Sequence, residues 1–106
     1  MASLKDIQEY VSFVRSSKKI IIVNTSKNRE TRYLLGITVQ DQEDIIRGIK
    51  VTDYVSGPEL DRDSSRTGMI WIFKTKIDKN IIYVKIKIER IGEVKALSCH
   101  IDYLGE

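Results

Sequence analysis

The last third of the chain reads MIWIFKTKIDKNIIYVKIKIERIGEVKALSCHID from residue 69 to residue 102. Apolar and polar side chains alternate through residues 69–77, 82–89 and 97–102, and a period of two is typical of β-strands with one buried face. Asp78-Lys79-Asn80 and Ile91-Gly92 separate these three stretches. Because such short connections join antiparallel neighbours, the segment predicts a three-stranded antiparallel meander.

The final hairpin has a predicted register. If Ile91-Gly92 is a two-residue loop, Arg90 lies opposite Glu93. The same register pairs Ile86 with Leu97, Val84 with Cys99, Tyr83 with His100 and Lys85 with Ser98. A slip by one residue would pair core positions with polar ones along the whole strand. We therefore expect the Tyr83 and His100 side chains to be direct neighbours, with Cβ atoms about 4.5–5.5 Å apart.

The preceding hairpin leaves two registers open. A loop at Asp78-Lys79 places Lys74 opposite Tyr83, whereas a loop at Lys79-Asn80 places Lys76 there. Either register puts one set of polar and basic side chains on the sheet face away from the core. The set is Tyr83, Lys85, Lys87, Ser98, His100 and one or both of Lys74 and Lys76. The basic charge is thus concentrated where the only histidine lies.

Two helices are expected to cover the apolar face of this sheet. Apolar residues recur at helical spacing after the capping pair Ser3 and Asp6, which predicts a helix over residues 4–16. Thr38, with an aspartate three residues later, predicts the start of a second short helix that ends near Gly48.

The remaining segments predict one further strand and two loops. Residues 19–24 are short and β-branched, which suits a strand, and the polar residues 24–32 are interpreted as a loop. Residues 53–68, which contain Gly57-Pro58, are interpreted as an irregular loop. The fold class expected is α+β, with an N-terminal helix and a second short helix packed on an antiparallel sheet.

Composition limits the classes of protein that the chain can represent. The 106 residues correspond to a single domain, and 18 Lys and Arg against 15 Asp and Glu leave a net charge of only +3. One cysteine and one histidine exclude a disulfide framework and the zinc patterns that need two or more of either. The longest apolar run covers residues 20–23, so we expect neither export nor membrane insertion. The expectation is a cytoplasmic protein without a metal or another cofactor.

The polar sheet face suits cleavage of RNA without a metal ion. As the only histidine of the chain, His100 is the candidate general acid or base. Lys85 would stabilise the charged phosphorane, and Tyr83 would position the phosphate or transfer a proton. The candidate RNA-binding residues are Lys74, Lys76, Lys87 and Arg66.

These residues also have plainer interpretations. A row of lysines on an exposed sheet is commonly a solvated surface or protects a sheet edge, and a lone histidine is commonly structural. Cys99 alternates with Ser98 and His100 along its strand and should face the core. We therefore interpret it as a small buried apolar residue and not as a nucleophile. The acidic residues Asp53, Glu59, Asp61 and Asp63 lack the spacing of a calcium loop and are interpreted as solvated charge.

Five segments, taken in order, resemble the MqsR-type toxins of bacterial toxin–antitoxin systems. They are residues 35–38 (LGIT), Asp53-Tyr54 with Gly57-Pro58 and Asp61, residues 71–73 (WIF), residues 82–86 (IYVKI) and residues 97–100 (LSCH). The resemblance covers roughly residues 34–103. It implies a RelE-like fold and a ribosome-independent endoribonuclease that acts on mRNA and is held inactive by a cognate antitoxin protein.

The resemblance also implies roles for individual residues. The family's tyrosine falls on Tyr83, its lysine on Lys85 and the basic residue of the final strand on His100. Ser56 and Ile72 stand where the best-known member has a lysine and a glutamine. Lys74, on the strand that carries Ile72, is the candidate to replace the missing cation.

Two functions other than RNA cleavage remain open at this point. A ParE-like inhibitor would use the same scaffold to bind a protein target such as gyrase, without nuclease activity. A non-catalytic module would bind nucleic acid or protein, and its affinity for RNA would fall with salt according to the lysines engaged.

Overall fold

The computed structural model describes residues 2–61, 68–90 and 92–103. Its first half contains α1 (Leu4–Ser16), β1 (Lys19–Ile22), α2 (Ser26–Leu35), α3 (Val39–Arg47) and the 3-10 helix η1 (Val51–Asp53). Its second half contains β2 (Tyr54–Leu60), β3 (Met69–Ile77), β4 (Asn80–Arg90) and β5 (Glu93–Ile101). The fold is therefore α+β, as the sequence predicts.

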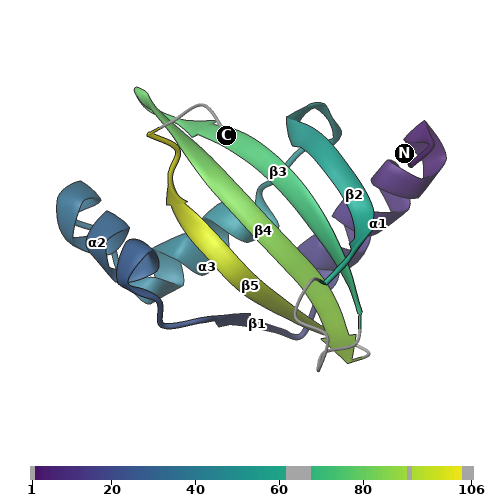
Figure 1. Cartoon of the computed structure of the whole chain (residues 1–106), viewed down its shortest axis with the longest axis horizontal. Helices are drawn as coiled ribbons and strands as arrows, with labels where there is room; N and C mark the ends of the chain where they lie inside the picture. Colours follow the sequence, from purple (N-terminus) through teal and green to yellow (C-terminus); the bar gives the residue numbers. More distant parts are fainter. Residues whose placement is uncertain (1, 62–67, 91, 104–106) are drawn as a thin grey trace.

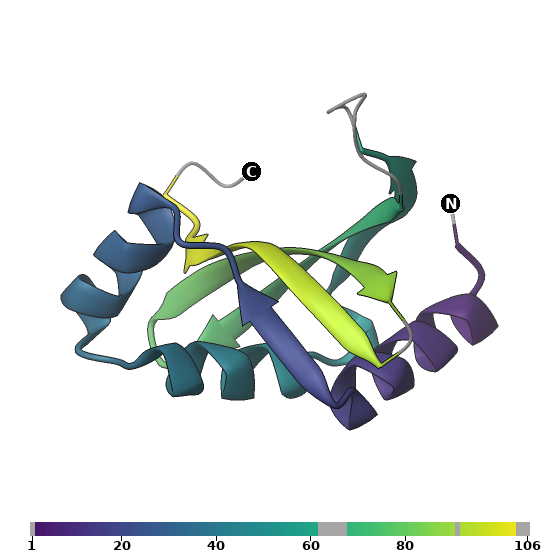
Figure 2. The ribbon, with the colours of Figure 1, turned by 90° about the horizontal axis from the view of Figure 1, so that it is seen from below.

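The five strands form one sheet in the order β1-β5-β4-β3-β2 (Figure 1). β3, β4 and β5 are the predicted antiparallel meander. β2 pairs antiparallel with β3, whereas β1 pairs parallel with β5. α1 and α3 lie along one face of the sheet, and α2 lies beside the end of β5 (Figure 2). None of the helices in the described part of the chain is long and apolar enough to cross a membrane.

The core lies between α1, α3 and one face of the sheet. α1 buries one side, at Ile7, Tyr10, Val11 and Val14, because these positions recur at the spacing that lines one face of a helix. The Tyr10 ring stacks on Trp71 at 4.1 Å between ring centroids. Burial of each such apolar side chain stabilises the fold by about 1.5–3 kcal/mol. The predicted first helix and its capping box between Ser3 and Asp6 are confirmed.

The second predicted helix and the short strand are also confirmed. α3 begins after Thr38, whose hydroxyl accepts a hydrogen bond from the Asp41 N–H, and it ends before Gly48. β1 is shorter than the predicted strand and stops at Ile22.

The interpretation of residues 24–32 as a loop is wrong, because α2 occupies Ser26–Leu35. Of its residues only Asn28 and Thr31 are buried, so α2 has no apolar stripe that periodicity could detect. Its ends do carry a sequence signal. The Thr25 side chain caps the first turn, and Gly36 closes the helix with a left-handed φ of 65°.

The interpretation of residues 53–68 as an irregular loop is wrong for its first half, which forms the last residue of η1 and the edge strand β2. Pro58 is compatible with an edge strand, because it has no N–H to donate to a neighbour. Gly57 has a φ of 123°, and a Cβ atom there would lie 2.8 Å from the Ile70 carbonyl oxygen. Glycine is thus required where β2 passes Trp71.

The register of the final hairpin is confirmed at both ends and shifted between them. Arg90 pairs with Glu93, and the pairs of Tyr83 with His100, Val84 with Cys99 and Lys85 with Ser98 are as predicted. The prediction for Ile86 is wrong, because Ile86 pairs with Ala96 and leaves Leu97 as an extra residue. A second irregularity between Ile88 and Arg90 restores the register.

The register left open for the preceding hairpin is settled by the pairing of β3 with β4. Lys74 lies opposite Tyr83, whereas Lys76 lies opposite Ile81. Ala96, and not Leu97, occupies the core-facing position of β5. The bulge at Leu97 therefore lies between the half of β5 that pairs with β1 and the half that carries Ser98 and His100.

Candidate active site

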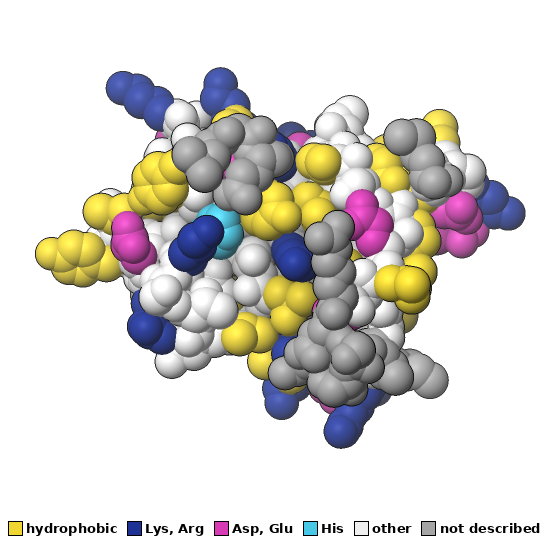
Figure 3. Space-filling view, viewed as in Figure 1, with side chains coloured by type: hydrophobic (Ala, Val, Ile, Leu, Met, Phe, Trp, Pro, Cys, Tyr) yellow, Lys and Arg dark blue, Asp and Glu magenta, His cyan; other side chains and the backbone are white. Residues whose placement is uncertain are grey.

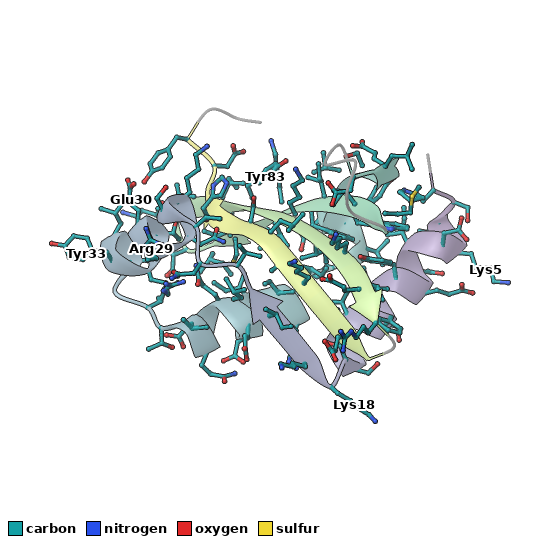
Figure 4. All side chains as sticks on the ribbon, turned by 60° about the horizontal axis from the view of Figure 1, so that its bottom comes forward. Lys5, Lys18, Arg29, Glu30, Tyr33 and Tyr83 are labelled. Atoms are coloured by element: carbon teal, nitrogen blue, oxygen red, sulfur yellow. The ribbon has the colours of Figure 1, made fainter. Side chains whose placement is uncertain are left out.

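Tyr83 and His100 are direct neighbours on the sheet face that α1 and α3 do not cover. Their rings stack with centroids 5.3 Å apart and planes inclined by 25°. The antiparallel pairing of β4 and β5 places them there, since directly opposed residues share one face. In Figure 4, Tyr83 lies on the side of the sheet away from α3. The most specific geometric prediction from the sequence is confirmed.

The His100 ring is held in one orientation. Its Nδ1 lies 3.0 Å from the Ile101 carbonyl oxygen, and because a carbonyl only accepts, Nδ1 carries the hydrogen in this contact. In the neutral ring the lone pair is then on Nε2, which becomes the nitrogen able to accept a proton. His100 is 7% exposed. The side chain is thus a mostly buried imidazole with a defined tautomer.

A pocket of about 370 Å³ brings the three candidate catalytic residues together. Its lining consists of Thr25, Ser26, Lys27, Tyr83, Lys85, Leu97, Ser98 and His100. Lys85 lies between Ile72 on β3 and Ser98 on β5 in the strand register. Figure 3 shows the histidine and Lys or Arg side chains on this face of the molecule. The pocket can accept an anion, since lysine, hydroxyl and imidazole groups surround it and no acidic residue is in its described lining.

The other predicted lysines are not part of this pocket. The Lys74 ammonium lies 3.0 Å from the carboxylate of Asp102, whose side chain is only 3% exposed. Lys74 is therefore paired with a carboxylate, and its side chain is not part of the pocket lining. Lys76 is exposed on β3, opposite Ile81 and outside the pocket lining.

The expectation that Lys87 lies on an open surface, which its interpretation as an RNA-binding residue requires, is wrong. Lys87 lies on the expected face, but its side chain is 1% exposed and its ammonium lies 3.1 Å from the Asp61 carboxylate. An ammonium so buried and paired does not meet a phosphate. Arg66 lies outside the described residues.

The edge of β5 is covered by helix side chains that sequence reasoning did not identify. β1 pairs only with Glu93 to Ala96, so the rest of this edge needs other hydrogen-bond partners. The Asn28 side-chain oxygen Oδ1 accepts from the Cys99 N–H, and the Asn28 side-chain Nδ2 donates to the Leu97 carbonyl. Thr31 accepts from the Ile101 N–H, and Gln42 donates to the Cys99 carbonyl. α2 and α3 thereby fix the backbone on both sides of His100.

The first turn of α2 was also missed as part of the site. Thr25, Ser26 and Lys27 line the pocket opposite the sheet, but a segment interpreted as a loop offered no reason to place them there. The capping threonine is the one signal that could have indicated a helix start at this point.

Cys99 points into the core and is fully buried, as its parity predicted. Burial raises the pKa of its thiol to about 12, because a thiolate would lose its hydration there. Among the described residues, no group of three or more His, Cys, Asp or Glu side chains is placed to hold a metal ion.

Comparisons with known proteins give no identity for the chain. No model of a protein family matches it, and neither does a curated protein or a solved structure. The resemblance to MqsR-type toxins therefore stays a prediction.

Proposed function

We propose that the protein is a metal-independent endoribonuclease toxin of a type II toxin–antitoxin system that cleaves single-stranded mRNA. The observation that carries the proposal is the stacked pair of Tyr83 and His100, which lines one pocket together with Lys85. The toxin assignment, and with it the cognate antitoxin that would hold the enzyme inactive, rests on the resemblance of five sequence segments to MqsR-type toxins.

Cleavage begins at the ribose 2′-hydroxyl in this proposal. Nε2 of His100 takes the 2′-hydroxyl proton, and the resulting oxygen attacks the adjacent phosphorus. The bond from phosphorus to the 5′ oxygen breaks, and that oxygen leaves with a proton as a 5′-hydroxyl. The products are a 2′,3′-cyclic phosphate and a 5′-hydroxyl end. No redox partner is required.

Lys85 and Tyr83 assist this step from the neighbouring strand. The Lys85 ammonium stabilises the extra negative charge on the phosphorane, a contribution that is often the largest in such reactions. The Tyr83 phenol positions the phosphate or donates the proton to the 5′ oxygen. Its ring also restricts the His100 ring by stacking.

Single-residue variants test the proposal with purified protein and single-stranded RNA of varied sequence in EDTA. We expect fragments that end in a cyclic phosphate. His100→Gln should reduce the cleavage rate by about 10²–10⁴-fold, the usual range for loss of a general acid or base. Tyr83→Phe, which removes one hydroxyl, should also reduce it. Lys85→Ala, which removes the ammonium that stabilises the phosphorane, should reduce the cleavage rate as well. Lys76→Ala is its matched control, since Lys76 is exposed outside the pocket.

Thermal unfolding of each variant separates loss of chemistry from loss of folding. Intact RNA with all sequences, or full activity of a folded His100→Gln variant, would contradict the proposal. Growth arrest on expression that persists in His100→Gln would favour the inhibitor of a protein target instead.

A further inference from the structure

The residues at the N-terminus of α2 line the same pocket as His100. The Thr25 hydroxyl accepts a hydrogen bond from the Asn28 N–H, and the Thr25 carbonyl accepts from the Arg29 N–H. The N–H groups of Ser26 and Lys27 precede these and have no acceptor within the described part of the chain. Such first-turn N–H groups, together with the helix dipole, attract anions.

α2 differs from the other two helices in what occupies this position. In α1 and α3 an aspartate of the first turn, Asp6 or Asp41, folds back onto the N-terminus in a capping box. α2 has no acidic residue in its first turn and carries Lys27 there instead. An external anion would therefore meet no carboxylate from the first turn of α2.

The opposite wall of the pocket independently favours an anion. Lys85 and Ser98 face each other across β4 and β5, and His100 lines the same space with its side chain more than nine-tenths buried. With Nδ1 engaged by the Ile101 carbonyl, Nε2 is the nitrogen left to meet a ligand. The pocket volume of about 370 Å³ is at the small end of the range for ligand pockets, about 300–1,000 Å³.

We propose that this pocket binds a single phosphate group of a nucleic-acid backbone, held between the α2 N-terminus and the sheet. The N–H groups of Ser26 and Lys27 donate to its non-bridging oxygens from one side. The Lys85 ammonium and the Ser98 hydroxyl contact it from the other. The inference deepens the proposed function by naming where the substrate phosphate lies, but binding itself requires no cleavage.

Proline at position 26 offers a selective test of the backbone contact. Ser26 is the first residue of α2, where proline is well tolerated because the N–H has no helical acceptor. Thr25 has φ −84° and ψ 161°, which suits a residue that precedes proline. Ser26→Pro therefore removes one phosphate donor and preserves the helix.

Val39→Pro is the matched control at the start of α3. Val39 occupies the same helix position, and Thr38 before it has φ −98° and ψ 171°. Its helix N-terminus is outside the pocket lining and is filled by Asp41. Lys27→Gln and Lys18→Gln form a second pair, since Figure 4 shows Lys18 at the other side of the molecule from Tyr83.

The ligands for the test are inorganic phosphate and the thymidine dinucleotide with one phosphodiester and no 2′-hydroxyl, which cannot be cleaved by 2′-hydroxyl attack. Nuclear magnetic resonance titration should shift the amide signals of Ser26 and Lys27 downfield, and these shifts should saturate. Ser26→Pro should weaken binding by about tenfold, as expected for loss of a hydrogen bond to a charged group. Lys27→Gln keeps its N–H but removes a positive charge from the pocket lining, so it should weaken binding by a smaller factor. Val39→Pro and Lys18→Gln should bind as the unmodified protein does.

Equal affinity of Ser26→Pro and the unmodified protein for the dinucleotide would overturn the inference, as would equal weakening by Val39→Pro. Binding that depends on Ser26, without cleavage of any RNA, would uphold the phosphate site and refute the nuclease. Cleavage of RNA at full rate by Ser26→Pro would uphold the nuclease and refute the phosphate site.

Discussion

The two faces of the sheet follow from one alternating sequence pattern, yet they differ in how they are built. The covered face packs Phe73, Ile82 and Val84 against α1 and α3, and all three are fully buried. The open face carries Tyr83, Lys85 and His100. The Tyr83 and His100 rings stack, all three side chains line one pocket, and His100 also contacts the Ile101 carbonyl. Apolar packing tolerates few arrangements of the covered face, whereas the open face depends on individual polar partners.

The largest contrast is expected for neighbouring residues of β3. Phe73→Ala on the covered face should lower the free energy of unfolding by about 3–5 kcal/mol, because it leaves a cavity in a closed core. Ile72→Ala on the open face should cost about 1 kcal/mol, since Ile72 is only partly buried. Urea denaturation of both variants measures the difference. Equal losses would show that the two faces are packed alike.

The ion pair between Lys87 and Asp61 belongs to the open face, yet its Lys87 side chain is almost fully buried. Asp61→Asn keeps the shape but removes the charge beside a 1% exposed ammonium, and should cost about 1.5–3 kcal/mol. Lys87→Met removes the cation and keeps much of the apolar stem, so it should cost less. Adding Lys87→Met to Asp61→Asn should then recover stability in the same urea assay. A double variant less stable than Asp61→Asn alone would count against a buried charge at this position.

The smallest effect is expected from the pH response of the covered face. The Cys99 pKa is raised from 9.0 to about 12 in the folded protein, so above pH 9 the unfolded chain loses this proton first. Stability should therefore be full below pH 9 and fall by about 1 kcal/mol between pH 9 and pH 10. Chemical denaturation at both pH values should show this fall, and Cys99→Ala should abolish that part of it. Stopping at pH 10 limits the contribution of Tyr10, whose pKa burial also raises.

The sequence predicted well wherever a repeating apolar pattern met a closed core. The meander, the first helix and the pairing of Tyr83 with His100 depend on periodicity, and periodicity is a property of local sequence. It failed for α2, since the buried residues of that helix are Asn28 and Thr31. Polar side chains are buried there because β5 offers unpaired backbone groups, a tertiary fact that no local pattern contains.

The candidate site was predicted in part for the same reason. Strand parity brought Tyr83, Lys85 and His100 together. It could not show that Asp61 buries Lys87 or that Asp102 pairs with Lys74, because both partners come from outside the paired positions. The bulge at Leu97 was equally hidden, since one extra residue in a strand leaves the alternation on either side intact.

Asn28 connects the two walls of the pocket, through its backbone N–H on one side and its side-chain amide on the other. Its backbone N–H is part of the first turn of α2, and its fully buried amide holds the backbone at Leu97 and Cys99. The start of the helix and the strand that bears His100 are thus tied together within a single residue. Such a pocket is preorganised, so a ligand loses little of its binding free energy to ordering the protein. Amide hydrogen exchange in the two segments should accordingly occur as one cooperative unit.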